Sequence, residues 1–139
     1  MNVHGLPVEF GNAGDAPTNG TGWFVGWSDW AHAPFDLRWQ APGTASTGLC
    51  IKWYRHADGH PHGEVKPIST GRTLSILVGE AGAFRLDFCR SPAFEPEATL
   101  SHVLRRPGDF AIWGEGIHHR TWSLETSSIL TVRWDPVAR

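Results

Sequence analysis

The chain has 139 residues, which is the size of one domain. Its formal net charge of −2 provides no general attraction to nucleic acids or to anionic membranes. No apolar run approaches the ~20 residues of a transmembrane helix. Residues 1–14 have neither the basic start nor the apolar core of a secretory signal. These properties predict a cytoplasmic protein that binds neither nucleic acid nor membrane.

Turn-forming residues are frequent, with 16 glycines and 10 prolines in the chain. Such a composition suits many turns and few long helices. Two cysteines, Cys50 and Cys89, lie inside apolar runs. In a cytoplasmic protein such cysteines are usually buried free thiols. The composition therefore predicts a turn-rich fold without a disulfide.

In chain order, residues 1–21 come first, and their glycine, asparagine, proline and threonine content predicts an irregular arm. Apolar runs of strand length follow, and no window repeats apolar residues at helical spacing. Phe84, Leu86 and Phe88, for example, alternate with charged residues, which is typical of a strand with one buried face. The predicted strands are Trp23–Trp27, Leu49–Tyr54, Val65–Ile68, Thr73–Val78, Ala83–Cys89, Thr99–Leu104, Asp109–Trp113, Arg120–Leu124 and Ser128–Trp134. This spacing predicts a β-sandwich or barrel, and without a linker or repeat residues 1–139 should form a single domain.

A strand–turn–strand motif spans residues 108–119. Gly114 and Gly116, one residue apart, indicate a tight turn after an apolar run. His118 and His119 come soon after that turn, where a histidine is often directed at a metal, a ligand or a partner side chain. Since side chains alternate along a strand, we expect His119 to face inward and His118 outward.

This motif resembles in its spacing the second motif of the cupin superfamily. Members of that superfamily are small double-stranded β-helix (jelly-roll) barrels. That motif is a glycine, five residues, a proline, any residue, a glycine, two residues and a histidine. Gly108, Gly116 and His119 match it, whereas Gly114 replaces the proline and Ser123 the asparagine that follows. The resemblance covers roughly residues 48–134 and implies an all-β barrel that pairs into a homodimer through edge strands.

Residues 72–78 and 129–134 look like a bacterial cupin-like group that often carries a signal peptidase label. Peptidase chemistry of that kind needs a serine–lysine arrangement, and the sequence gives no sign of one. The resemblance therefore bears on the fold and leaves that label without support.

The first cupin motif expects two histidines one residue apart, then a glutamate, then a glycine. Counting back from Gly79 puts Lys66 and Ile68 in the histidine positions and Arg72 in the glutamate position. Cations there would repel a divalent metal ion. The resemblance therefore implies a pocket in which Lys66, Arg72 and His119 favour a carboxylate or phosphate. In the same barrel, Trp113 or Trp122 would supply an apolar wall.

A second interpretation retains a metal. His60, His62 and Glu64 alternate, so an extended backbone would put all three on one face. With His119 they form a set suited to Zn, Fe or Mn. The segment contains Gly63 and looks like a loop, which holds ligand geometry less firmly than a strand.

The eight tryptophans offer a third interpretation, because flat rings stack on sugar faces. Most of them lie in strand-like runs and are expected to fill the barrel. Trp27 and Trp30 lie in a less regular segment and are candidates for a pocket lid or an inter-subunit arm.

The leading functional hypothesis is a small-molecule-binding cupin-like protein that recognises a polar or anionic metabolite without a cofactor. The alternative is a metal-dependent enzyme of the dioxygenase, isomerase or lyase type that uses His60, His62, Glu64 and His119. Because jelly-roll barrels host enzymes, storage proteins and sensors, the fold leaves open whether the chain has a catalytic activity.

Overall fold

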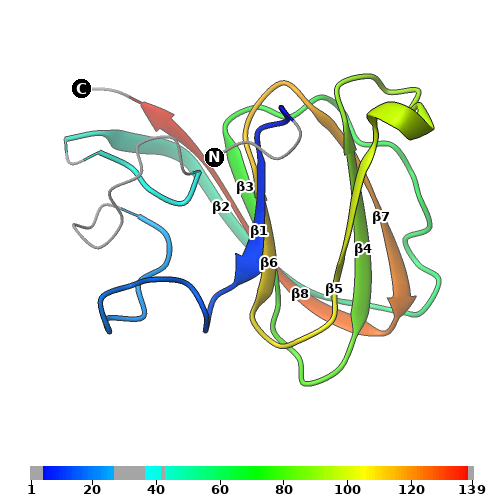
Figure 1. Ribbon diagram of the computed structural model, residues 1–139, viewed down its shortest axis with the longest axis horizontal. Helices are drawn as coiled ribbons and strands as arrows, with labels where there is room; N and C mark the ends of the chain where they lie inside the picture. Colours follow the sequence, from blue (N-terminus) through cyan, green and yellow to red (C-terminus); the bar gives the residue numbers. More distant parts are fainter. Residues whose placement is uncertain (1–4, 27–36, 42, 138–139) are drawn as a thin grey trace.

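Eight strands of the computed structural model form two antiparallel sheets, and the structure describes residues 5–26, 37–41 and 43–137. The larger sheet has the order β1-β6-β3-β8-β2 and faces the smaller sheet, which has the order β5-β4-β7 (Figure 1). The strands are β1 (Val8–Asn12), β2 (Ala45–His56), β3 (Arg72–Leu77), β4 (Ala83–Cys89), β5 (Leu100–Leu104), β6 (Asp109–Trp113), β7 (His118–Glu125) and β8 (Ser127–Val137). Within the described ranges, no helix is long and apolar enough to cross a membrane.

The segment between residues 59 and 69 extends the smaller sheet along the free side of β7. Its backbone nitrogens donate hydrogen bonds to carbonyls in or beside β7: Gly59 to Ser123 (2.7 Å), Gly63 to Thr121 (2.8 Å), Lys66 to His119 (2.9 Å) and Ser69 to Ile117 (2.8 Å). Pro61 and Pro67 have no amide hydrogen, so this pairing stays irregular. The strand that the sequence predicts at Val65–Ile68 is therefore a hydrogen-bonded segment rather than a regular strand.

With that segment included, successive elements cross repeatedly between the two sheets. The chain passes from β2 to the smaller sheet at residues 59–69, returns at β3, and crosses again to β4 and β5. It then alternates through β6, β7 and β8. This order is that of a jelly roll. The fold is the all-β double-stranded β-helix that the sequence predicts.

The core lies between the sheets because the strands alternate in the way the sequence indicates. Phe84, Leu86 and Phe88 of β4 are at most 3% exposed and pack toward the larger sheet. Trp113 of β6 and Ile129 of β8 meet them in the same cluster. A second cluster on the other face of the larger sheet includes Leu74, Ile76 and Trp134, and residues 24–25 and 37 pack against it.

The N-terminal segment contains a strand where the sequence predicts an irregular arm. β1 pairs with β6, and Val8 is fully buried opposite Trp113. The alternation of Val8 and Phe10 around Glu9 is the signal for this strand. Residues 23–26, predicted as part of a strand, form only an isolated bridge from Gly26 to Trp39. Trp27 and Trp30, the candidates for a lid or arm, lie outside the described residues.

Candidate functional site

A cavity of about 650 Å³ opens between the sheets. Its walls come from β2, β3, β7 and β8, from Trp113 of β6 and from the segment beside β7. Cationic side chains, histidines and hydroxyl groups line it together with aromatic and aliphatic groups: Lys52, Lys66, Arg133, His56, His60, His119, Ser75, Thr121, Thr131, Phe84, Trp113 and Ile129 among others. Of the described residues, no aspartate or glutamate lines this cavity. The lining is therefore cationic.

Strand alternation decides which side chains reach the cavity. On β7, His119 and Thr121 line it, and on β3 Thr73 and Ser75 do so. The residues between them point to the other face of each sheet. The inward direction of His119 agrees with the expectation from the sequence.

Lys66 and His119 lie side by side at the boundary between the irregular segment and β7. The Lys66 backbone nitrogen donates to the carbonyl of His119 at 2.9 Å, and the Lys66 carbonyl lies 3.1 Å from Nδ1 of His118. Lys66 itself is exposed, as are Lys52 and Arg133. The cations therefore line the cavity at its solvent-exposed side.

Burial and neighbouring cations keep His119 uncharged. Burial lowers its pKa to about 4, and the charges of Lys66, Lys52 and His118 act in the same direction. The His119 ring packs against Trp113, with 4.9 Å between ring centroids. At neutral pH this imidazole is therefore a hydrogen-bonding group and carries no charge.

His56 is a second histidine of the lining, and its pKa is also lowered. Burial is the largest cause, followed by the charges of Lys52, His60 and Lys66. Lys52, His56 and Arg133 line the cavity as well, although they are not among the site residues predicted from the sequence. The signal for the first two is the spacing of two residues along β2, where Cys50, Lys52, Tyr54 and His56 all line the cavity.

Arg72, predicted as an anion clamp, does not line the cavity. Its Nη1 donates to the carbonyls of Leu37 at 2.9 Å and of Trp39 at 3.0 Å. The reason is the pleat of β3, since Thr73 and Ser75 face the cavity and Arg72 takes the opposite face. In this structure Arg72 holds residues 37–39 against the larger sheet.

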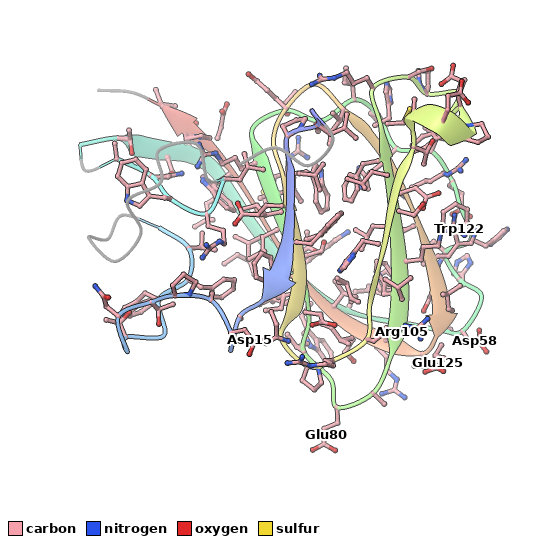
Figure 2. The ribbon with its side chains drawn as sticks, in the orientation of Figure 1. Asp15, Asp58, Glu80, Arg105, Trp122 and Glu125 are labelled. Carbon is pink, nitrogen blue, oxygen red and sulfur yellow. The ribbon has the colours of Figure 1, made fainter. Side chains whose placement is uncertain are left out.

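Trp122, predicted as an apolar wall, lies on the outer side of β7 (Figure 2). The guanidinium carbons of Arg85 and Arg120 lie 4.4 Å and 5.0 Å from its ring centroid. Gly63 packs so closely that a Cβ there would come within 2.6 Å of the indole. Of the residues predicted for anion binding, the structure brings Lys66, Trp113 and His119 together in the cavity.

The alternative metal set is not assembled. His60 lines the cavity, whereas His62 and Glu64 form an exposed pair with 3.6 Å between Nδ1 and Oε1. Gly63 has a φ of +95°, which interrupts the extended backbone that would align the three side chains. The part of the chain that the structure describes holds no group of three or more His, Cys, Asp or Glu side chains placed to hold a metal ion.

The chemistry of the lining agrees with that finding. Lys66 lies beside His119, in one of the positions where the cupin motif would have a histidine. A metal site would need carboxylates or several imidazoles close together and no ammonium group among them. Among the described residues, the cavity lining therefore offers no ligand set that fits a divalent cation.

No family model and no curated protein matches the chain. Several solved structures share part of its architecture. Hydroxypropylphosphonic acid epoxidase from S. wedmorenis, in complex with fosfomycin, is 10% identical over 61% of this chain and 43% of that one, with a TM-score of 0.47. The 2-hydroxyethylphosphonate dioxygenase of Streptomyces albus, with substrate and Fe(II) bound, is 17% identical over 66% of this chain and 18% of that one (TM-score 0.46).

A third similar structure is the WlaRB TDP-quinovose 3,4-ketoisomerase from Campylobacter jejuni. It is 10% identical over 62% of this chain and 61% of that one, with a TM-score of 0.47. The chain thus spans less than two thirds of each of these three proteins. Its assignment as a jelly roll rests on the strand order described above.

Proposed function

We propose that this chain binds a small anionic metabolite inside the barrel. The observation that carries the proposal is the charge of the cavity lining, where Lys52, Lys66 and Arg133 meet no carboxylate among the described lining residues. In a partly enclosed site, surrounded by low-dielectric walls, such charges attract an anion more strongly than they would in bulk water.

The cationic and the apolar residues of the lining would contact different parts of the ligand. Its anionic group would lie among the exposed cations, because lysine and arginine donate charge-assisted hydrogen bonds to carboxylates and phosphates. The body of the ligand would lie against Phe84, Trp113 and Ile129, which supply the apolar wall. The volume of about 650 Å³ lies within the range of small-molecule sites, which is roughly 300–1,000 Å³.

The lowered pKa values of His56 and His119 support the same assignment. The charges of Lys52 and Lys66 contribute to both shifts, so the cations act together on the interior. A bound anion would offset that field. The anion would thereby offset part of the electrostatic repulsion between the two lysines.

The test is calorimetric titration with succinate and with inorganic phosphate at low and high salt. We expect binding of at least one of them, weakened by salt and weakened about tenfold or more by Lys66→Gln or Arg133→Gln, since one charge-assisted hydrogen bond contributes about 1.5–3 kcal/mol. Arg106→Gln is the matched control, because Arg106 lies at an exposed turn against Asp15 and does not line the cavity.

Two results would contradict the proposal. One is the absence of binding for both anions, or binding that is indifferent to Lys66 and Arg133. The other is a purified protein that holds one Zn, Fe or Mn per chain and loses it on His119→Ala. That result would instead favour the metal-dependent alternative.

A further inference from the structure

Two ring nitrogens of the cavity lining are buried without a hydrogen-bond partner in the described part of the protein. One is Nε1 of Trp113 on β6, a residue that is 2% exposed, and the other is Nδ1 of His119 on β7. The two rings come from opposite sheets and pack together with 4.9 Å between their centroids. Both rings line the cavity.

An unpartnered indole nitrogen is unusual in a protein interior. The Trp113 N–H can only donate, and burying it without an acceptor is unfavourable. The alternation that makes β6 and β7 the walls of the barrel holds the ring in place, so it cannot turn toward solvent. The nitrogen is therefore a donor for which the described part of the protein supplies no acceptor.

His119 complements that donor. The imidazole is neutral at pH 7, so Nδ1 either donates or accepts according to the tautomer. With the proton on Nδ1, each of the two packed rings carries one unpaired donor. Phe88 packs against both rings, with centroid distances of 5.2 Å to Trp113 and 6.4 Å to His119. These apolar surroundings strengthen a hydrogen bond to any oxygen that reaches the pair.

We infer that the ligand is an oxo acid: an anion whose uncharged carbonyl oxygen accepts hydrogen bonds from Trp113 Nε1 and His119 Nδ1. Its carboxylate would lie among Lys52, Lys66 and Arg133, as in the proposed function on which this inference rests. A ligand of this class has a hydrogen-bond acceptor at one end and a negative charge at the other. Its charge would pair with the cations of the lining, and its carbonyl oxygen would pair with the two buried ring nitrogens.

The experiment compares oxo acids with unsubstituted acids of equal length. The probes are levulinate and its homologues one and two carbons longer, each paired with pentanoate, hexanoate or heptanoate. At one or more lengths we expect the oxo acid to bind about tenfold tighter than its partner, because the carbonyl satisfies a donor that otherwise remains unpaired. In Trp113→Phe that ratio should fall to near one, and in the control Trp23→Phe, a residue 70% exposed, it should not change.

A second measurement is made on the wild-type protein and needs no variant. The indole N–H resonance of Trp113, assigned through its contacts with the packed Phe88 ring, should move downfield when the oxo acid binds and not when the unsubstituted acid binds. Equal affinity for both acids at every length, or an indole resonance indifferent to the oxo acid, would overturn the inference and leave anion binding intact. If none of the acids binds, the proposed function fails as well.

Discussion

At the scale of single residues, the cavity combines charged groups at its exposed side with neutral imidazoles inside. After burial, which is the largest cause, the lysines proposed to bind an anion also lower the pKa of His119 and of His56. The lysine side chains are exposed, whereas the His119 ring is largely buried and stays uncharged at neutral pH. A cationic site and an uncharged histidine are therefore two results of the same arrangement.

His119 should make the stability of the protein depend on pH. Its pKa is about 4 in the folded chain and near 6.5 in the unfolded chain, so the unfolded state binds the proton first. The contribution is complete above pH 6.5 and is lost as the pH falls toward 4, up to about 3 kcal/mol at 1.36 kcal/mol per pKa unit. Urea unfolding at several pH values, in buffers without multivalent anions, measures this loss.

The control for this prediction is His119→Leu, which cannot titrate. His56 and His102 also have lowered pKa values and add acid sensitivity to both proteins, so the informative quantity is the difference between the two curves. Parallel curves between pH 7 and pH 4 would show that His119 remains solvated. That would also remove one support of the proposed site.

At the scale of the elements, one buried carboxylate connects the three strands of the smaller sheet. Asp87 of β4 is fully buried on the outer side, where it accepts hydrogen bonds from Ser101 of β5 at 2.7 Å and from Arg120 of β7 at 3.1 Å. Arg85 of β4 adds a second guanidinium, with 3.0 Å between Nε and Oδ1. Every strand of this sheet therefore contributes a donor to Asp87.

Asp87→Asn should destabilise the protein by about 3 kcal/mol, because it removes one buried charge and leaves its partners imperfectly paired. The free energy of unfolding in urea measures this. The matched control is Asp15→Asn, since Asp15 and Arg106 form an ion pair whose side chains are 69% and 66% exposed. That change should cost less than about 0.5 kcal/mol. Equal effects of the two variants would show that the network around Asp87 adds little.

The strands β4 and β2 differ in how well the sequence predicts which of their faces is buried. Alternation in β4 predicts its bounds and its buried face, because one side of that strand packs in the core. In β2 the alternation does not show which face meets the core, since all of its residues are at least partly exposed. Lys52 and His56 therefore could not be assigned to the cavity without the fold.

Arg72 illustrates a second limit of sequence reasoning. Counting along a motif locates a position to within about one residue, and in a strand a shift of one residue moves every side chain to the other face. The count selects Arg72, whereas the cavity is lined by the neighbouring Thr73. His119 escapes this uncertainty because two glycines fix the turn just before it.

At the scale of the whole molecule, β2 forms one edge of the larger sheet and is unusually apolar for an exposed strand. Leu49, Ile51 and Trp53 alternate along it and are 64%, 62% and 63% exposed. An edge strand with unpaired backbone groups and a row of exposed apolar side chains tends to pair with another chain. We propose that a second copy of this chain covers it, in a homodimer that continues the larger sheet.

Trp53→Glu should convert such a dimer into a monomer, because a charge in the middle of the row cannot be buried without a partner. Light scattering coupled to size exclusion measures the mass, which should be twice 15.3 kDa for the wild type and 15.3 kDa for the variant. Trp23→Glu is the control, since Trp23 is 70% exposed outside β2 and the change should leave the dimer intact. A wild-type protein that stays monomeric at high concentration would exclude the pairing. A dimer that persists in Trp53→Glu would show that the interface lies on another surface.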